Sequence, residues 1–387
     1  MSEPITNVME KHIANVAKKP VRILHVFGNL NRGGAETFIM SVYRNIDRKK
    51  VQFDFMVHTT EKCAYDDEIE ALGGRIYRVP TYSGVNHLDY KRKWGNFFEN
   101  NKEHKIIHGH MTSTASIYLK IAKKYGLTTI AHSHSTSSGD GFSSKVKDYL
   151  QKPLINISDH LFACSGAAGA WCYGEEVEKK ANFKVVKNAI DIEKFTFDQT
   201  SRDAKRQELN VENKFVVGHV GRFFAPKNHD FLINVFAHIH KTNHNAILLL
   251  IGDGDLRSGI EQKVKALGLE SNVIFTGVRE DVPELLCAMD VFVFPSLWEG
   301  VPVTLIEAQA NGLRCIISDA VTDEVKIAEL VETVSLQDSV EYWADKVLAH
   351  VDSNGRDDMR EGVQQAGYDI KEIAAWLEEF YLGAKNE

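Results

Sequence analysis

Cysteine is scarce in this sequence, and no two cysteines stand at a spacing that binds metal or forms a redox pair. The five residues are scattered and odd in number: Cys63, Cys164, Cys172, Cys287 and Cys315. This pattern excludes a CxxC zinc or redox motif and argues against a disulfide framework. Because disulfides are rare where thiols are kept reduced, we expect the protein in the cytoplasm.

Long hydrophobic runs are also missing. The longest apolar runs, such as Ala246 to Ile251, have the length of a strand, whereas a membrane-spanning helix needs about 20 apolar residues. Residues 1–20 are polar and lack the apolar segment of a signal peptide, which agrees with a cytoplasmic address. What remains is a globular composition over 387 residues, which is enough for about two domains.

Charge is divided unevenly along the chain. Residues 1–195 hold 28 Lys and Arg against 21 Asp and Glu, and the remaining residues hold 18 against 32. A basic half favours an anionic partner, and a basic residue near an anionic membrane surface contributes about 1 kcal/mol. Peripheral contact with the inner face of the membrane and an ordinary solvated surface both agree with this imbalance. No nucleic-acid partner is expected.

Strand-like and helix-like segments alternate through both halves. The chain opens with a buried strand from Val21 to Phe27, a glycine loop, and a helix from Ala35 to Asn45. Further strands are expected at 53–57, 75–79, 106–107, 128–131, 160–164, 215–220, 246–251, 273–275, 291–294 and 315–317. Helices are expected at 66–72, 114–124, 230–240, 256–267, 282–287, 304–311 and 370–382. The alternation predicts parallel sheets and an α/β fold. Residues 186–197, with the polar residues 198–213, form the expected domain junction.

The first glycine loop is a weak candidate for an anion site. Gly33-Gly34-Ala35-Glu36 opens the first helix, where backbone N–H groups can hold a phosphate and glycine lets it come close. A tight turn with a helix cap explains the residues equally well. The loop lacks the GxGxxG fingerprint of a dinucleotide-binding dehydrogenase and the Gly-Lys-Ser/Thr of a P-loop, so neither class is expected.

A second loop carries two cations directly after a strand. Arg222 follows Gly221, and Lys227 stands five residues further on. An arginine fork and a lysine point charge together suit a diphosphate, although two solvated loop cations would give the same pattern.

The segment from Phe294 to Glu307 is the most specific pattern in the chain. A loop follows the strand, and a helix is expected to begin near Val303. Glu299 stands in the loop and Glu307 about one turn inside the helix. A carboxylate accepts hydrogen bonds from vicinal sugar hydroxyls, and a helix N-terminus can hold a phosphate. The preference of helix starts for acidic residues explains Glu299 but not Glu307.

These motifs occur in one order, and together they resemble glycosyltransferase family 4, which has the fold called GT-B. The turns Ile251-Gly252-Asp253-Gly254 and Phe275-Thr276-Gly277-Val278 belong to the same resemblance, which covers nearly the whole chain. Members that build capsular and exopolysaccharides look closest. The resemblance implies two facing Rossmann-like domains with a deep interdomain cleft. It places an acceptor-side domain at 1–195, a nucleotide-sugar domain at 196–365, and at 366–387 a helix that crosses back.

The resemblance also implies roles for single residues. Arg222 and Lys227 would bind the donor diphosphate, Glu307 the ribose hydroxyls and Glu299 the sugar. The remaining donor-site positions are Gly33, Gly34, Val278, Gly300, Val303 and Thr304. The donor would be a nucleotide-diphosphate sugar, with uridine as the base, and the acceptor a glycan or a lipid-linked glycan. No cofactor is expected.

Two pairs of histidines each follow a strand. In His108-Gly109-His110 and His132-Ser133-His134 the period of two puts both imidazoles on one side. Four histidines suggest a metal, but no acidic residue or cysteine stands at ligand spacing and the family normally needs none, so no metal is expected. The resemblance places a sugar-contacting histidine at His134, with His132 as the alternative; an ordinary loop residue is the other interpretation.

Asp253-Gly254-Asp255 mimics the Asp-x-Asp metal motif of the other major glycosyltransferase fold, but turn chemistry at a strand end explains it.

The family implies transfer with retention of the anomeric configuration. A double displacement needs a carboxylate nucleophile close to the anomeric carbon, and none stands out, so front-face substitution is expected, assisted by Arg222 and Lys227. Two alternatives remain: a sugar-nucleotide epimerase of the same fold, and a sugar-nucleotide-binding protein without catalysis.

Overall fold

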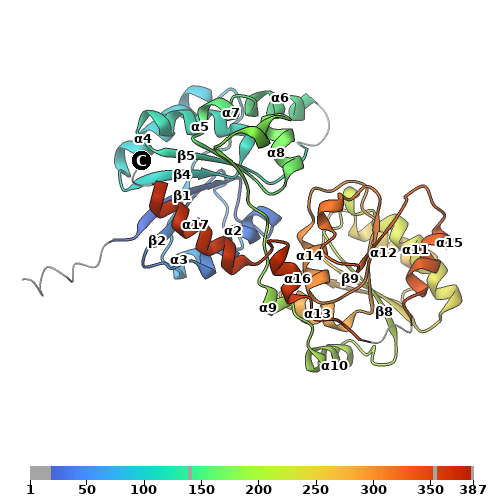
Figure 1. The fold of residues 1–387 in the computed structure, drawn as a ribbon. Coiled ribbons are helices and arrows are strands. Elements are labelled where there is room, and N and C mark those ends of the chain that lie inside the picture. Colours follow the sequence, from blue (N-terminus) through green and yellow to red (C-terminus); the bar gives the residue numbers. More distant parts are fainter. Residues whose placement is uncertain (1–18, 138–141, 352–354, 385–387) are drawn as a thin grey trace, which may run out of the picture. The chain divides into compact units, whose positions relative to one another are not determined.

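The computed structural model describes residues 19–137, 142–351 and 355–384 (Figure 1). The chain divides into two compact units. The first contains the residues up to His132, residues 146–161 and the residues from Ala374 onward, and the second contains residues 133–145 and 162–373. The strands form one sheet of seven strands and one of six.

The seven-stranded sheet has the order β3-β2-β1-β4-β5-β6-β7. β1 lies in the middle and pairs in parallel with both β2 and β4. Its strands are buried apolar runs, as expected for a parallel sheet covered on both faces. Their bounds are β1 Val21–Phe27, β2 Val51–Val57, β3 Ile76–Arg78, β4 His104–Gly109, β5 Thr128–Ser133, β6 His160–Ala163 and β7 Phe183–Val185.

Helices cover this sheet on both sides. Figure 1 shows α4 and α5 on one face and α2, α3 and the C-terminal helix α17 on the other. α17 is held in the first unit by its side chains: Tyr381 Oη lies 2.7 Å from His108 Nδ1, and Glu378 accepts a hydrogen bond from the Asp47 backbone at 3.0 Å. The bounds are α2 Gly34–Asn45, α3 Asp66–Ala71, α4 His87–Asn100, α5 Thr112–Lys124, α6 Phe142–Gln151, α7 Leu154–Ile157, α8 Gly166–Tyr173 and α17 Ile370–Ala384.

The six-stranded sheet has the order β10-β9-β8-β11-β12-β13. Its strand pairs are parallel, and the order is that of the Rossmann fold. The strands are β8 Phe215–Val220, β9 Ala246–Ile251, β10 Val273–Gly277, β11 Val291–Phe294, β12 Cys315–Ser318 and β13 Val331–Val334. The helices are α9 Ile192–Phe195, α10 Gln199–Glu208, α11 His229–Thr242, α12 Arg257–Ala266, α13 Val282–Ala288, α14 Val303–Ala310, α15 Val340–Leu348 and α16 Arg360–Gln365.

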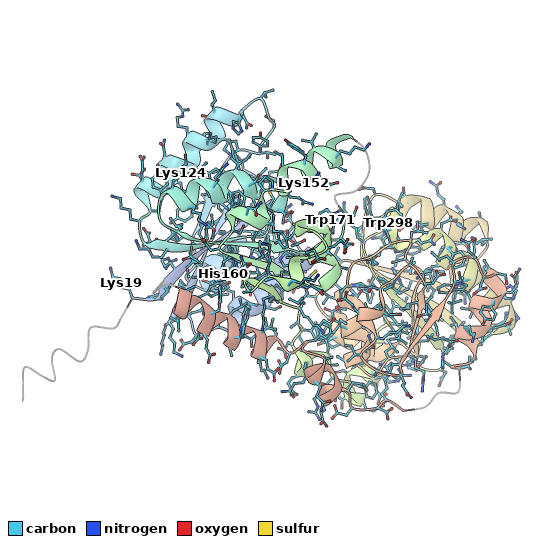
Figure 2. All side chains as sticks on the ribbon, turned by 45° about the horizontal axis from the view of Figure 1, so that its top comes forward. Lys19, Lys124, Lys152, His160, Trp171 and Trp298 are labelled. Carbon is cyan, nitrogen blue, oxygen red and sulfur yellow. The ribbon has the colours of Figure 1, made fainter. Side chains whose placement is uncertain are left out.

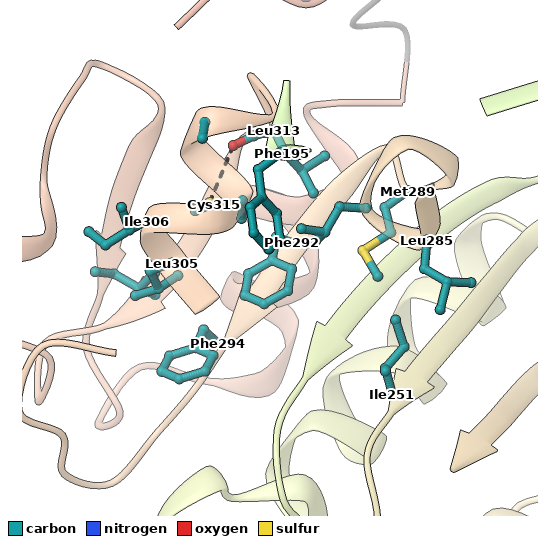
Figure 3. Packing of buried hydrophobic residues seen from close by; sticks show 14 of the residues in the cluster. Phe195, Ile251, Leu285, Met289, Phe292, Phe294, Leu305, Ile306, Leu313 and Cys315 are labelled. Carbon is teal, nitrogen blue, oxygen red and sulfur yellow. Dashed lines mark hydrogen bonds between the residues drawn. The ribbon is translucent and has the colours of Figure 1, made fainter. Parts of the chain in front are cut away.

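The core beneath β11 fixes the position of α14. Figure 3 shows Phe292 and Phe294 of β11 in one apolar cluster with Leu305 and Ile306 of α14. All four side chains are fully buried, and burying a side chain of this size contributes about 1.5–3 kcal/mol. The same packing therefore holds the first turn of α14, and Glu307 behind it, close to the end of β11.

Most of the expected elements are confirmed, and four strands agree to the residue: β1, β8, β9 and β11. Among the described residues of the first half, the helices α4, α6, α7 and α8 were not anticipated. The polar residues 198–213, expected to be part of a junction, contain α10, which Asp198 caps by accepting a hydrogen bond from the Ser201 backbone at 2.6 Å. The domain bounds 1–195, 196–365 and 366–387 stay predictions.

Candidate functional site

The candidate site lies where the chain order of the six-stranded sheet reverses. β8 and β11 are neighbours in the sheet, and their helical connections leave in opposite directions. Ligands of such sheets bind outside the carboxyl ends of the strands at this point. The loop after β8 contains Arg222 and Lys227, and the loop after β11 contains Glu299.

Three contacts join these two loops. The Leu297 backbone N–H donates to the Pro226 carbonyl at 2.8 Å, and the Asn228 side chain donates to the Pro295 carbonyl at 3.1 Å. Lys227 Nζ lies 2.7 Å from Glu299 Oε1. The loops are therefore one connected structure before any ligand is bound.

The Lys227–Glu299 ion pair is largely shielded from water. The two side chains are 19% and 15% exposed, and the Lys227 ammonium also lies over the Phe294 ring, 4.5 Å from its centre. The sequence-based assignment gave these residues separate ligands, a diphosphate and a sugar. The structure brings them into direct contact, so a ligand that binds one of them also changes the surroundings of the other.

Arg222 has the opposite character. Its side chain is 68% exposed, and the nearest carboxylate oxygen, on Asp255, is 3.9 Å away. The next residue, Phe223, is fully buried and stacks on His229 with ring centres 4.1 Å apart. Phe223 thus anchors the loop while the Arg222 guanidinium stays accessible to a ligand.

A glycine turn supports the loop after β8. Gly252 has φ +134°, and a Cβ at this position would overlap the Gly221 carbonyl oxygen. The Gly221 backbone N–H also donates to Ile251 at 2.9 Å. Only glycine lets the turn after β9 approach this closely. In the same turn Asp253 pairs with Arg257 at 3.2 Å and caps the Gly254 N–H at 2.7 Å, which is a turn role rather than a metal-binding one.

The first turn of α14 offers unpaired polar groups. Its N-cap is Pro302, which supplies no side-chain cap. The Thr304 hydroxyl is buried and has no hydrogen-bond partner among the residues that the structure describes. Free N–H groups at a helix start bind anions, and a buried unpaired hydroxyl is a second polar group for which the protein supplies no partner.

Glu307 stands behind this turn. Its side chain is only partly exposed, and its carboxyl makes no hydrogen bond or ion pair within the described residues. Burial raises the pKa of Glu307 to about 7, and Lys194 opposes the shift weakly. A carboxyl held without a partner gains hydrogen bonds when a diol or another donor arrives.

The remaining predicted residues belong to other segments of the chain. Val278 follows β10 and is 64% exposed. Gly33 and Gly34 begin α2 in the first unit, where the Glu36 side chain folds over Gly33 and burial raises the pKa of Glu36. His134 Nδ1 lies 3.3 Å from the Asn188 side chain, and burial lowers the pKa of His134 to about 4.

Sequence reasoning missed two buried histidines beneath the loops. His219 lies in β8, and its ring contacts His229 at the start of α11 with ring centres 4.8 Å apart. Burial, more than the charge of Lys227, lowers the pKa of His229 to about 4. The position of His219 inside the buried strand β8 could have indicated it as a core residue, but nothing in the sequence marks its packing against His229.

Two family models match the chain. The model described as "Glycosyl transferases group 1" covers residues 201–368, and the model described as "Glycosyltransferase Family 4" covers residues 32–194. A relative from Bacillus subtilis, the putative glycosyltransferase EpsF, is 36% identical over 375 residues, which is 95% of this chain and 98% of that protein. The chain belongs to the family 4 glycosyltransferases.

Other relatives share less of the sequence. The capsular polysaccharide biosynthesis glycosyltransferase CapH of Staphylococcus aureus is 24% identical, over 77% of this chain and 80% of that protein. An Escherichia coli UDP-Gal:α-D-GlcNAc-diphosphoundecaprenol α-1,3-galactosyltransferase is 28% identical, over 56% of this chain and 58% of that protein.

Solved structures agree on the fold. Anabaena Alr3699/HepE in complex with UDP superimposes with a TM-score of 0.75 at 20% identity, over 94% of this chain and all of that chain. The GT-B fold expected from the sequence is therefore confirmed. No helix in the described part of this glycosyltransferase is long and apolar enough to cross a membrane.

Proposed function

We propose that this glycosyltransferase moves a hexose from a UDP-sugar, with retention of configuration, to a glycan or lipid-linked glycan during polysaccharide biosynthesis. The observation that carries the donor site is the arrangement around the end of β11. A pre-formed Lys227–Glu299 pair, the open start of α14 and the partnerless carboxyl of Glu307 belong to two connected segments, one after β8 and one after β11.

Each part of this site suits one part of a nucleotide sugar. Arg222 and Lys227 supply cations for the diphosphate, and the N–H groups of Val303 and Thr304 add donors at a helix N-terminus. Glu307 accepts hydrogen bonds from the two ribose hydroxyls, and Glu299 and the Gly300 backbone meet the sugar. Val278, exposed after β10, would lie along the base. The other predicted donor contacts, Gly33, Gly34 and His134, rest on the family resemblance alone.

The choice of donor and acceptor draws on the relatives. Alr3699/HepE is the subject of complexes with UDP and with UDP-glucose. The Escherichia coli relative uses UDP-Gal and a diphosphoundecaprenol-linked acceptor, and CapH acts in capsular polysaccharide biosynthesis. For the present chain, α6 exposes Val146 and Tyr149 beside Lys145 and Lys147, a surface that suits a lipid-linked acceptor at an anionic membrane.

Catalysis then depends on positioning and on charge. Glu299 is paired with Lys227, and Glu307 is assigned to the ribose hydroxyls, so no carboxylate is assigned as a nucleophile. A front-face substitution therefore fits better than a double displacement. As the bond to the sugar breaks, negative charge grows on the leaving diphosphate, where Arg222, Lys227 and the start of α14 stabilise it. The diphosphate takes the acceptor proton.

Product analysis tests this proposal. Wild-type protein is incubated with UDP-glucose, UDP-galactose or the corresponding UDP-N-acetylhexosamines and with a lipid-diphosphate-linked sugar acceptor. The anomeric configuration of the product is then determined by NMR. We expect UDP release only when acceptor is present, and an α-linked product from an α-linked donor. An epimerised donor formed without acceptor, or a β-linked product, would contradict the proposal.

Comparison of two variants tests the roles of the cations. We expect Arg222→Ala to lower kcat by about 10²–10³-fold, the usual cost of one oxyanion-stabilising group. His134→Ala, which removes a neutral side chain, should cost much less. Equal losses in the two variants would mean that the charge on the diphosphate is not what Arg222 stabilises.

A further inference from the structure

Four buried histidines lie on one face of the seven-stranded sheet. His25 of β1 pairs in register with His108 of β4, and His110 continues beside β1, donating its backbone N–H to Val26 at 3.0 Å. His132 of β5 follows at the same end of the sheet. All four are at most 8% exposed. They gather at the carboxyl end of β1 and β4, which is where the chain order of this sheet reverses.

The imidazole rings approach one another closely enough to share an ion. His25 Nδ1 lies 3.0 Å from His110 Nε2, and His108 Nε2 lies 3.1 Å from His132 Nδ1. One ring nitrogen from each of His25, His108 and His110 lies within 4.8 Å of the other two.

Aromatic side chains pack against the cluster. Phe27 stacks on His110, Phe53 packs on His25, and Phe38 meets the edge of His132. His25 Nε2 is buried and has no hydrogen-bond partner within the described residues. Burying a polar nitrogen unpaired costs free energy that an apolar side chain at the same position would avoid. Simple packing therefore does not explain a histidine at this position.

We propose that His25, His108 and His110 form a binding site for a divalent transition-metal ion such as Zn²⁺. Imidazole nitrogens are typical ligands of Zn²⁺, and bonds of 2.0–2.1 Å in a tetrahedron put neighbouring nitrogens about 3.3 Å apart. The His25–His110 separation of 3.0 Å has to open by only a few tenths of an ångström. His132 stands beside His108 to complete the shell.

A hydroxyl group orients one of these ligands. Tyr381 Oη of α17 lies 2.7 Å from His108 Nδ1 and leaves Nε2 directed toward the cluster. Metal-binding histidines usually have such a partner on their second nitrogen. An ion at this position would join β1 to β4 and, through Tyr381, to the C-terminal helix. The proposed role is structural, and the donor chemistry proposed above assigns no step to a metal.

Cobalt binding to the full-length protein is the test. Chelator-treated, metal-free protein is titrated with Co²⁺, whose visible absorption reports a four-coordinate site, and Zn²⁺ is then added as a competitor. We expect one Co²⁺ per chain, displacement by Zn²⁺, and a higher Tm with either ion. No stoichiometric binding by the wild-type protein would overturn the proposal.

Variants locate the ion. His25→Phe and His110→Phe keep an aromatic ring but remove a ligand, and we expect each to abolish stoichiometric binding. Tyr381→Phe keeps every ligand and should weaken binding by about 10–100-fold, the usual cost of losing an orienting partner. His244→Ala removes an exposed histidine that touches His240 and controls for surface binding; it should change nothing.

Circular dichroism and nucleotide binding show whether each variant is folded. If a phenylalanine variant does not fold, Tyr381→Phe decides the question, because unchanged affinity there would overturn the proposal. Binding that survives in folded His25→Phe and His110→Phe would overturn it as well.

Discussion

Breaking the Lys227–Glu299 pair should affect stability and activity in different ways. Each side chain is less than one-fifth exposed, so a partner left alone is a poorly solvated charge. Such a charge costs about 1–3 kcal/mol. A value near 2 kcal/mol lowers Tm by roughly 4–8 °C in a unit of this size. Lys227→Met and Glu299→Gln should each show a shift of this order. The larger shift is expected for Lys227→Met, because Gln at position 299 can still accept a hydrogen bond from Lys227, whereas Met offers no donor to Glu299.

The double variant separates the two effects. Removing both charges leaves no unpaired ion, so Lys227→Met/Glu299→Gln should regain most of the Tm lost in Lys227→Met. Its kcat should stay low, about 10²–10³-fold below wild type, because the diphosphate still lacks its cation. Thermal unfolding and initial rates with a UDP-sugar are the measurements. This reasoning would be refuted if the Tm loss of the double variant equalled the sum of the losses of the two single variants. It would also be refuted if the double variant regained wild-type kcat together with its Tm.

Three further changes test the rest of the site. Burial raises the pKa of Glu307 from 4.5 to about 7, so the folded chain holds this proton more tightly than the unfolded chain. The stability of the wild-type protein should therefore fall as the pH rises from 4.5 to 7, and Glu307→Gln should lack that part of the fall. Parallel curves of stability against pH for the two proteins would be contrary evidence. Thr304→Val should leave the Tm of the ligand-free protein unchanged or higher but weaken UDP binding about 5-fold. Thr304→Ser, which keeps the hydroxyl, should bind UDP normally. Equal UDP affinities of Thr304→Val and the wild-type protein by calorimetry would exclude a hydroxyl contact. Gly252→Ala is strained and clashes with Gly221. It should lower the free energy of unfolding and weaken UDP binding by about 1–3 kcal/mol each, and a normal Tm would contradict the packing described for this turn.

The sequence predicted the sheet framework well because buried parallel strands are short, continuous apolar runs. β8, β9 and β11 are largely such runs, bounded by polar, glycine or proline residues, and their limits agree with the structure. α4 and α6 were missed because their apolar residues are interspersed with lysines and other polar residues. The same holds for α10, whose side chains are almost all polar.

The candidate site was predictable in its members but not in its contacts. Motif spacing brought Arg222, Lys227, Glu299 and Glu307 to the ends of adjacent strands, since β8 and β11 meet at the reversal of chain order. Spacing cannot show that Lys227 and Glu299 form an ion pair, because two loops 72 positions apart have to fold against each other first. The proximity of His25 to His110 is equally invisible, as it depends on β1 pairing with β4.

Nucleotide binding tests the central claim most directly. The measurement is the Tm of wild-type protein and of Glu307→Ala with UDP, GDP, ADP or CMP. A ligand at 100 times its Kd stabilises the protein that binds it by about 2.7 kcal/mol. We predict a Tm increase with UDP that exceeds the increase with the other nucleotides and is lost in Glu307→Ala. No increase with any nucleotide, or an equal increase in the variant, would contradict a donor site at the end of β11.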